Sequence, residues 1–87
     1  MSIAFKDIHP KAPVHILIVP KQHHERPEQL TQEELHDLFS GSEQIAKIMD
    51  VKETGYRLLF NIGRHAGQVI DHVHLHLLGG KQSKEMY

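Results

Sequence analysis

Three histidines alternate with apolar residues near the end of the chain, directly before Gly79-Gly80. Successive side chains of a β-strand point to opposite faces, so a strand over residues 72–78 places all three imidazoles on one face and the apolar side chains on the other. The three are His72, His74 and His76. An imidazole can act as nucleophile, acid or base near neutral pH. The segment therefore predicts phosphoryl-type chemistry or metal binding.

The spacing of the three histidines argues against one metal ion held by all of them. At about 3.3 Å per residue, His72 and His76 begin about 13 Å apart, whereas zinc needs each ligand nitrogen at about 2.0 to 2.1 Å. A two-histidine site would need ligands from elsewhere, and the chain has no cysteine. We therefore expect no metal site and no required cofactor, with zinc kept as the alternative.

A second alternative is that the histidines are only polar residues on a solvated sheet face. This interpretation explains the alternation, because any polar residue can face water. It does not explain the residue type, because lysine, threonine or glutamate would serve equally well. Histidine at three consecutive positions on one face therefore favours a functional cluster.

Length and composition limit the classes of protein that fit. The chain has 87 residues, of which 39% are hydrophobic, and a formal net charge of −1. These values predict one small folded domain, residues 1–87, whose limited core would gain from a partner subunit. A chain without a basic excess is not expected to bind nucleic acid, and one without a long apolar run is not expected to span a membrane. The expected location is the cytoplasm.

Hydrophobic patterns predict strands at residues 3–8, 14–19, 56–62 and 72–78, and a helix from Gln32 to about Met49. Thr31 and Glu34 have capping-box spacing at the helix start. Six residues near 3.6-residue spacing are expected to face the sheet: Leu35, Leu38, Phe39, Ile45, Ile48 and Met49. The fold class is α+β, an antiparallel sheet with one main helix on it. The helix should cover one face and leave the imidazole face open.

The chain resembles the histidine triad superfamily, and within it the Hint-like nucleotide-binding branch. The His-φ-His-φ-His-φ-φ signature, with φ apolar, is matched at every position of residues 72–78. Further similarity lies at residues 12–15, 19–23 and 55–57, and at Asn61, Gly67 and Gln68. The resemblance runs in order from about residue 5 to residue 81. It implies the antiparallel sheet and helix of that family.

The resemblance implies an enzyme that hydrolyses or transfers nucleoside monophosphates through a nucleotidyl-histidine intermediate. His74 matches the nucleophile, and the main-chain carbonyl of His72 would orient it. His76 matches the third histidine of the triad, which contacts the phosphate. His15 matches an upstream histidine of the same hydrogen-bonded cluster. The implied substrates are purine nucleoside phosphoramidates or aminoacyl adenylates, with AMP as product.

The resemblance also implies a nucleotide-binding site. Gly67 and Gln68 match loop positions that approach the phosphate, and Asn61 matches a nearby polar residue. Asp7 matches the residue that binds the ribose hydroxyls, a sound pairing of carboxylate and diol. The remaining matched positions are Phe5 and Ile8, which would pack on the base, and Val69 near the phosphate.

The chain differs from typical family members in two ways that keep a second function open. It begins after the usual N-terminal helix and strand, and Val69 stands where serine or threonine is usual. A nucleotide-binding or scaffold protein with little or no catalysis is therefore the alternative, and a fragment of a longer protein is another. Family members are usually homodimers, so a homodimer that binds an AMP-like nucleotide is expected.

Overall fold

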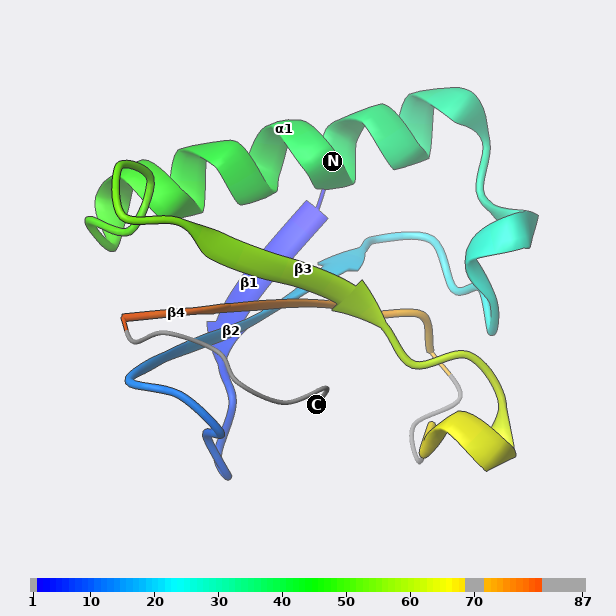
Figure 1. The fold of residues 1–87 in the computed structure, drawn as a ribbon. Coiled ribbons are helices and arrows are strands. Elements are labelled where there is room, and N and C mark those ends of the chain that lie inside the picture. The colour runs from blue at the N-terminus through cyan, green and yellow to red at the C-terminus, as the bar shows by residue number, and fades with distance from the viewer. Residues whose placement is uncertain (1, 69–71, 81–87) are drawn as a thin grey trace.

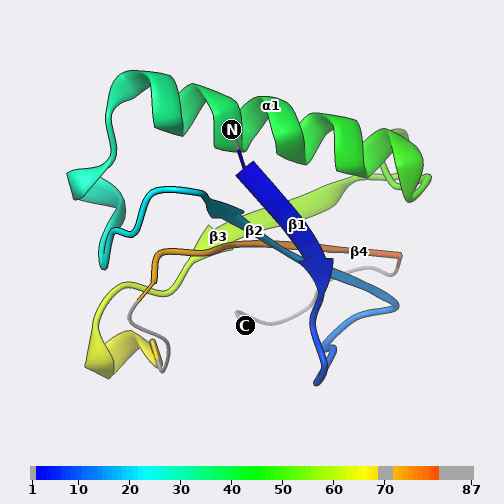
Figure 2. The same ribbon diagram turned by 180° about the vertical axis from the view of Figure 1, so that it is seen from behind.

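Four antiparallel strands form one sheet, and a long helix packs across one of its faces (Figures 1 and 2). The structure is a computed structural model that describes residues 2–68 and 72–80. The strands are β1 (Ser2–Lys6), β2 (Val14–Pro20), β3 (Tyr56–Phe60) and β4 (Leu75–Gly79). The helix is α1 (Gln32–Ile48), and two short 3-10 helices are η1 (Pro27–Gln29) and η2 (Arg64–Ala66). The α+β fold class is confirmed.

The strand order in the sheet is β1-β2-β4-β3, so β2 and β4 lie at the centre. The register pairs His15 with Leu78 and Leu17 with His76 across these central strands. Residues paired across two strands share a face of the sheet, and so do residues two apart in one strand. His15 and His76 therefore lie on the same face. Two histidines that are 61 residues apart in the sequence thus become neighbours.

The opposite face of the sheet carries the core. Seven buried residues from the central strands, α1 and the segment after α1 form one cluster: Ile16, Ile18, Leu38, Ala46, Val51, Leu75 and Leu77. Burial of a leucine or isoleucine side chain stabilises a fold by roughly 1.5 to 3 kcal/mol before opposing terms are counted. The core therefore holds β2 and β4 rigidly, and their other face presents the histidines.

Helix α1 begins where its cap predicts. Thr31 accepts a hydrogen bond at its hydroxyl from the Glu34 backbone N–H, at 3.0 Å, and the Glu34 carboxylate accepts one from the Thr31 N–H, at 2.9 Å. This reciprocal pair satisfies two backbone donors that the first helical turn cannot bond internally. The predicted helix start is confirmed.

The predicted apolar stripe of α1 is wrong at three of its six positions. Leu35, Phe39 and Ile48 are exposed, with 46% of Phe39 and 74% of Ile48 accessible to solvent. Leu38 is buried as expected, and Ile45 and Met49 are half-buried against the core, but the other buried positions are small residues, Ser42 and Ala46. Small side chains let the helix lie close to the sheet. If α1 were rotated so that Phe39 faced the sheet, the large ring would hold the two layers apart.

The predicted histidine strand is wrong in its first three residues. β4 begins at Leu75, so His72 and His74 precede it on irregular chain. The apolar residues that alternate with the histidines nevertheless stay buried as far back as Val73. As predicted, α1 leaves the imidazole face uncovered (Figures 1 and 2), but His15 and His74 on that side are only 5% and 8% exposed.

No helix in residues 2–68 and 72–80 is both long enough and apolar enough to cross a membrane. Helix α1 has 17 residues, several of them charged. A membrane-spanning helix needs about 20 mainly apolar residues.

Candidate active site

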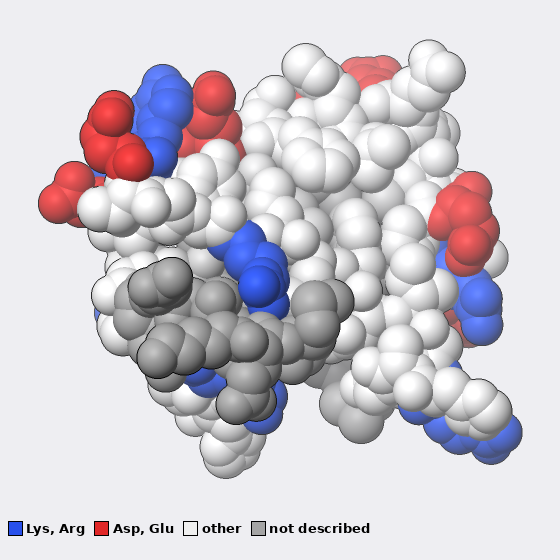
Figure 3. All heavy atoms as spheres, viewed as in Figure 1, with Lys and Arg blue, Asp and Glu red and all other residues white. Residues whose placement is uncertain are grey.

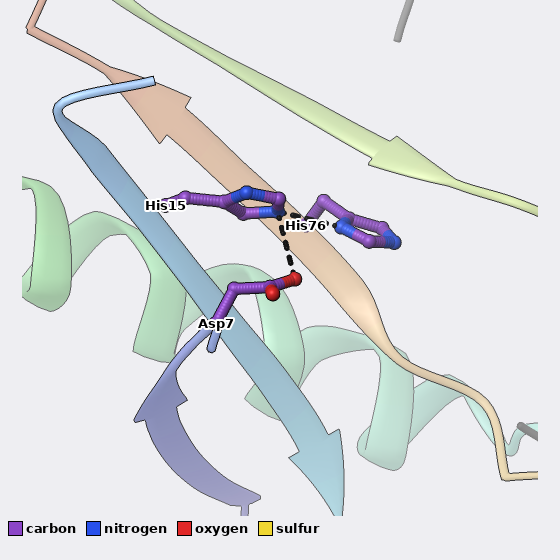
Figure 4. A group of neighbouring side chains, drawn as sticks. All are labelled: Asp7, His15 and His76. Atoms are coloured by element: carbon purple, nitrogen blue, oxygen red, sulfur yellow. Dashed lines mark hydrogen bonds and ion pairs between the residues drawn. The ribbon is translucent and has the colours of Figure 1, made fainter. Parts of the chain in front are cut away.

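His15, His76 and Asp7 form a close group on the sheet face opposite α1 (Figure 4). The Nε2 atom of His15 lies 2.9 Å from Nδ1 of His76 and 3.4 Å from Oδ2 of Asp7. β2 supplies His15, β4 supplies His76, and Asp7 directly follows β1. Three segments from distant parts of the sequence therefore converge on one hydrogen-bonded cluster.

Backbone contacts assign the tautomers of this cluster. The Lys11 N–H donates to Nδ1 of His15 at 3.1 Å, so the hydrogen of a neutral His15 ring is on Nε2. That Nε2–H donates to Nδ1 of His76, which places the hydrogen of His76 on its own Nε2. Nδ2 of Asn61 lies 3.4 Å from this Nε2, so the amide must turn by 180° and present its oxygen to accept the Nε2–H. His76 thus presents a donor on the side where Asn61 lies.

Both histidines of the pair resist protonation. The pKa of His76 is lowered to about 4, mainly by burial and then by the neighbouring His74 and His15, while Asp7 opposes the change. Burial also lowers the pKa of His15, with Asp7 again acting in the opposite direction and Lys11 adding to the decrease. At neutral pH both rings are therefore neutral, and each has one donor and one acceptor nitrogen.

His74 is held by the chain that precedes β4. Its Nδ1–H donates to the carbonyl oxygen of His72 at 2.9 Å, which leaves the Nε2 lone pair of a neutral ring unused by this contact. The His74 and His76 rings meet edge to face, with centroids 4.9 Å apart. The cluster is thus continuous from Asp7 through His15 and His76 to His74. A ring nitrogen with an available lone pair, on His74, and a hydrogen-bond donor, on His76, therefore lie side by side in it.

His72 lies apart from this continuous cluster and serves as a fixed support. Its Nε2–H donates to the Pro20 carbonyl at 3.1 Å, and its ring stacks on His23 with centroids 5.1 Å apart. The next residue, Val73, donates its N–H to the carbonyl of His24. The chain after β2 therefore clamps the segment from which His74 projects, and sequence analysis did not identify this clamp.

The residues expected to bind the nucleoside occupy the β1 side of the cluster. Phe5 pairs in register with Leu17, on the histidine face of the sheet, and is half-exposed. Ile8 is 87% exposed. Asp7 accepts a hydrogen bond at Oδ1 from the His9 N–H at 2.7 Å, and its other oxygen faces His15.

The residues expected to approach the phosphate lie on the η2 loop. Gly67 has φ of 88°, a left-handed conformation that favours glycine, and it ends η2. Gln68 accepts the Gly63 N–H at 2.7 Å and donates to the Glu25 carbonyl at 2.8 Å. Its amide thus joins two loops. Val69 lies outside the described residues.

Sequence analysis assigned Asp7 to the ribose and missed its contact with His15. The signal was available, because hairpin pairing of β1 with β2 continues to Asp7, whose N–H donates to the His15 carbonyl at 3.0 Å. Donor atoms of Asp7, His15 and His76 all lie within 4.8 Å of one another, a set that suits a zinc ion chemically. However, the Lys11 N–H on Nδ1 keeps the hydrogen of His15 on Nε2, the atom a metal would need.

The fold and this cluster place the chain in a known class. Residues 1–83 match the HIT domain family. A purine nucleoside phosphoramidase of Escherichia coli strain K12 is 41% identical over 81 residues, which are 90% of this chain and 68% of that protein. The chain belongs to the HIT domain family, and the predicted superfamily is confirmed.

Two further relatives agree with this assignment. An uncharacterised HIT-like protein of Helicobacter pylori, strain 26695, is 40% identical over 78 residues, covering 90% of this chain and 75% of its own length. The solved structure of a HIT family hydrolase from Clostridium thermocellum superposes with a TM-score of 0.91 at 40% identity. That match covers 98% of this chain and 76% of the other. The similarity supports a nucleotide hydrolase of the HIT type.

Proposed function

We propose that the protein hydrolyses purine nucleoside phosphoramidates, or related aminoacyl adenylates, to AMP through a nucleotidyl intermediate on His74. The observation that carries the proposal is the hydrogen bond from His74 Nδ1–H to the His72 carbonyl. It fixes the tautomer in which Nε2 has the lone pair that attacks phosphorus. The phosphoramidase relative in Escherichia coli supports the same reaction class.

The reaction has two displacements. His74 Nε2 attacks the phosphorus, the phosphorus–nitrogen bond of the substrate breaks, and its electron pair leaves with the amine, which takes a proton from solvent. Water then attacks the phosphorus and releases a proton to solvent, the bond to Nε2 breaks with its electron pair going to the ring, and AMP and neutral His74 are released. The His72 carbonyl stabilises the positive ring that exists between the steps, because Nδ1–H becomes a stronger donor. The Nε2–H of His76 donates to a phosphate oxygen.

We infer that the nucleoside lies over the β1 side, with the base near Phe5 and Ile8 and the ribose hydroxyls near Asp7. The exposure of both apolar side chains beside the histidine cluster supports this placement. Asn61, Gly67, Gln68 and Val69 are proposed for the phosphate side. We further propose a cytoplasmic homodimer, as the family resemblance and the small core suggest.

The direct test is turnover of a fluorogenic adenosine phosphoramidate by the wild type and by His74→Asn. We expect His74→Asn to lose at least roughly a thousandfold in kcat, because the amide nitrogen of asparagine has no nucleophilic lone pair with which to form the intermediate. The matched control is His36→Asn, which removes an exposed histidine of α1 and should leave turnover unchanged. Retained turnover in folded His74→Asn would contradict the mechanism.

A folded wild type without turnover would instead favour the alternative function, nucleotide binding without efficient catalysis. Calorimetric titration with AMP separates the two outcomes. Heat of binding without turnover supports the binding role, whereas no heat at millimolar AMP rejects both functions. The binding measurement uses the same purified chain and so needs no further variant.

A further inference from the structure

A second polar feature lies beside the histidine cluster and is not used by the proposed reaction. It is an open hollow of about 430 Å³ lined by Arg26, Ile62, Gly63, Arg64 and His65. None of the triad histidines lines it. The volume falls within the range of about 300 to 1,000 Å³ typical of small-molecule sites. The hollow is thus large enough for a small group rather than only for water.

The lining of the hollow is basic. Two of its five residues are arginines, one is a histidine, and none is acidic. Arg26 makes one ion pair within the described residues, a weak exposed contact in which Oε1 of Glu28 lies 3.9 Å from its Nη1. Arg64 forms no salt bridge within the described part of the chain. Figure 3 shows Lys and Arg side chains at the lower right, the end of the molecule at which η2 lies in Figure 1.

The two walls of the hollow are fixed to each other. Gln68 accepts the Gly63 N–H on one wall and donates to the carbonyl of Glu25, next to Arg26, on the other. Gly63 also lets Arg26 approach, because a Cβ at this position would lie 3.0 Å from Nη2 of Arg26. The Arg26 side chain is 54% exposed, so its guanidinium is accessible to an anion that enters the hollow.

The hollow adjoins the histidine cluster on its β3 side. Asn61, whose amide lies 3.4 Å from His76 Nε2, is followed directly by Ile62 of the hollow. Asp7 and Phe5, by contrast, belong to the β1 side, and β1 and β3 are the two edges of the sheet. A substrate whose nucleoside lies on the β1 side and whose phosphate lies at His76 therefore extends its remaining group toward this hollow.

We propose that the hollow of Arg26 and Arg64 binds an oxyanion, a carboxylate or a phosphate, carried by the leaving group of the substrate. This inference rests on the proposed function and adds a specificity for acidic leaving amines. The planar guanidinium forms two parallel hydrogen bonds with either oxyanion, which makes the contact stronger than a point charge would. A neutral leaving group makes no such contact.

The kinetic test compares matched adenosine phosphoramidates. One pair has β-alanine or β-alanine amide as the leaving amine, and the other has 2-aminoethyl phosphate or ethanolamine. We expect the ratio of kcat/KM, anionic to neutral, to fall about tenfold in the double variant Arg26→Gln/Arg64→Gln. The matched control is Lys52→Gln, a cation paired with Glu43 away from the hollow, which should leave the ratio unchanged. The pair with the larger ratio identifies the source of the oxyanion.

A binding test separates this inference from the proposed function. Wild type and double variant are titrated with inorganic pyrophosphate, and the backbone amide signals are followed by NMR. We expect shifts at Gly63, Arg64 and His65 in the wild type that disappear in Arg26→Gln/Arg64→Gln, whether or not the protein has turnover. Equal shifts in both proteins, or shifts confined to other residues, would overturn the proposal. An unchanged kinetic ratio in an active enzyme would overturn it too.

Discussion

A single backbone amide sets the protonation pattern of the histidine cluster. The Lys11 N–H occupies Nδ1 of His15, and the consequence passes through His15 Nε2–H to His76. The nitrogen of His76 that bears the hydrogen is therefore determined by a loop residue whose side chain takes no part. Sequence patterns identify histidines, but they do not show which nitrogen of a ring bears the hydrogen.

At the residue scale, we predict that acid destabilises the protein through His76. The pKa of its ring falls from an ordinary 6.5 to about 4 on folding. The unfolded chain thus binds the proton first as the pH falls, so this stability is complete above pH 6.5 and is lost toward pH 4. The free energy of unfolding should drop by at most about 3 kcal/mol over this range.

Urea unfolding followed at several pH values measures this effect. His76→Gln removes the titrating ring and should flatten the dependence between pH 6.5 and 4. His15 contributes in the same direction, because burial lowers its pKa as well. An equal slope in wild type and His76→Gln would show that other groups cause the acid sensitivity.

A second residue-scale prediction concerns metal removal. Because His15 and His76 are hydrogen-bonded to each other, we expect dialysis against a chelator to leave turnover and the unfolding midpoint unchanged. Added zinc should not raise turnover. Metal analysis before and after dialysis, together with thermal unfolding, measures this. Loss of activity that returns with zinc would instead identify the Asp7, His15 and His76 group as a metal site.

At the element scale, the start of α1 depends on its cap. We predict that Thr31→Ala lowers the free energy of unfolding by about 1 kcal/mol, because the Glu34 N–H loses its hydroxyl partner. Thr31→Ser keeps the hydroxyl and should remain near the wild type. Chemical denaturation of the three proteins measures the difference. A loss of equal size in both variants would point to the threonine methyl group rather than to the cap.

The sequence predicts some features of the elements better than others. Features that depend on contacts between nearby residues are predictable, whereas those that depend on contacts between distant segments are not. The α1 start was predictable because its cap lies within four residues. The buried side of α1 was not predictable, because it depends on how close the helix comes to the sheet. Gly41 of the helix lies so near Ser2 of β1 that a Cβ on Gly41 would be 3.1 Å from Oγ of Ser2. The strand start at Leu75 likewise depends on partners in β2 and β3.

The candidate site shows the same division. The triad signature could single out His72, His74 and His76, because that pattern is local. The contacts from Asp7 and Lys11 to His15, and the clamp of His23 and His24 on the chain before β4, join segments whose proximity only the folded chain creates.

At the scale of the whole molecule, we predict a homodimer. The sheet has two edges, β1 and β3, and large apolar side chains such as Phe39 and Ile48 are exposed. Light scattering should give twice the chain mass of 10.0 kDa, and the thermal midpoint should rise with protein concentration. A mass of one chain at all concentrations would contradict the prediction.

The pairing of β2 with β4 also bears on how the protein folds. These central strands lie at opposite ends of the sequence, so the pairing closes a loop of more than half the chain, from Ile18 to Leu75. Long-range pairing of this kind slows folding, because chain entropy is lost before contacts compensate for it. During synthesis, β2 cannot pair with β4 until β4 has left the ribosome. His15 and His76 then meet in the same event that completes the sheet, so the histidine cluster forms only once β4 has been synthesised.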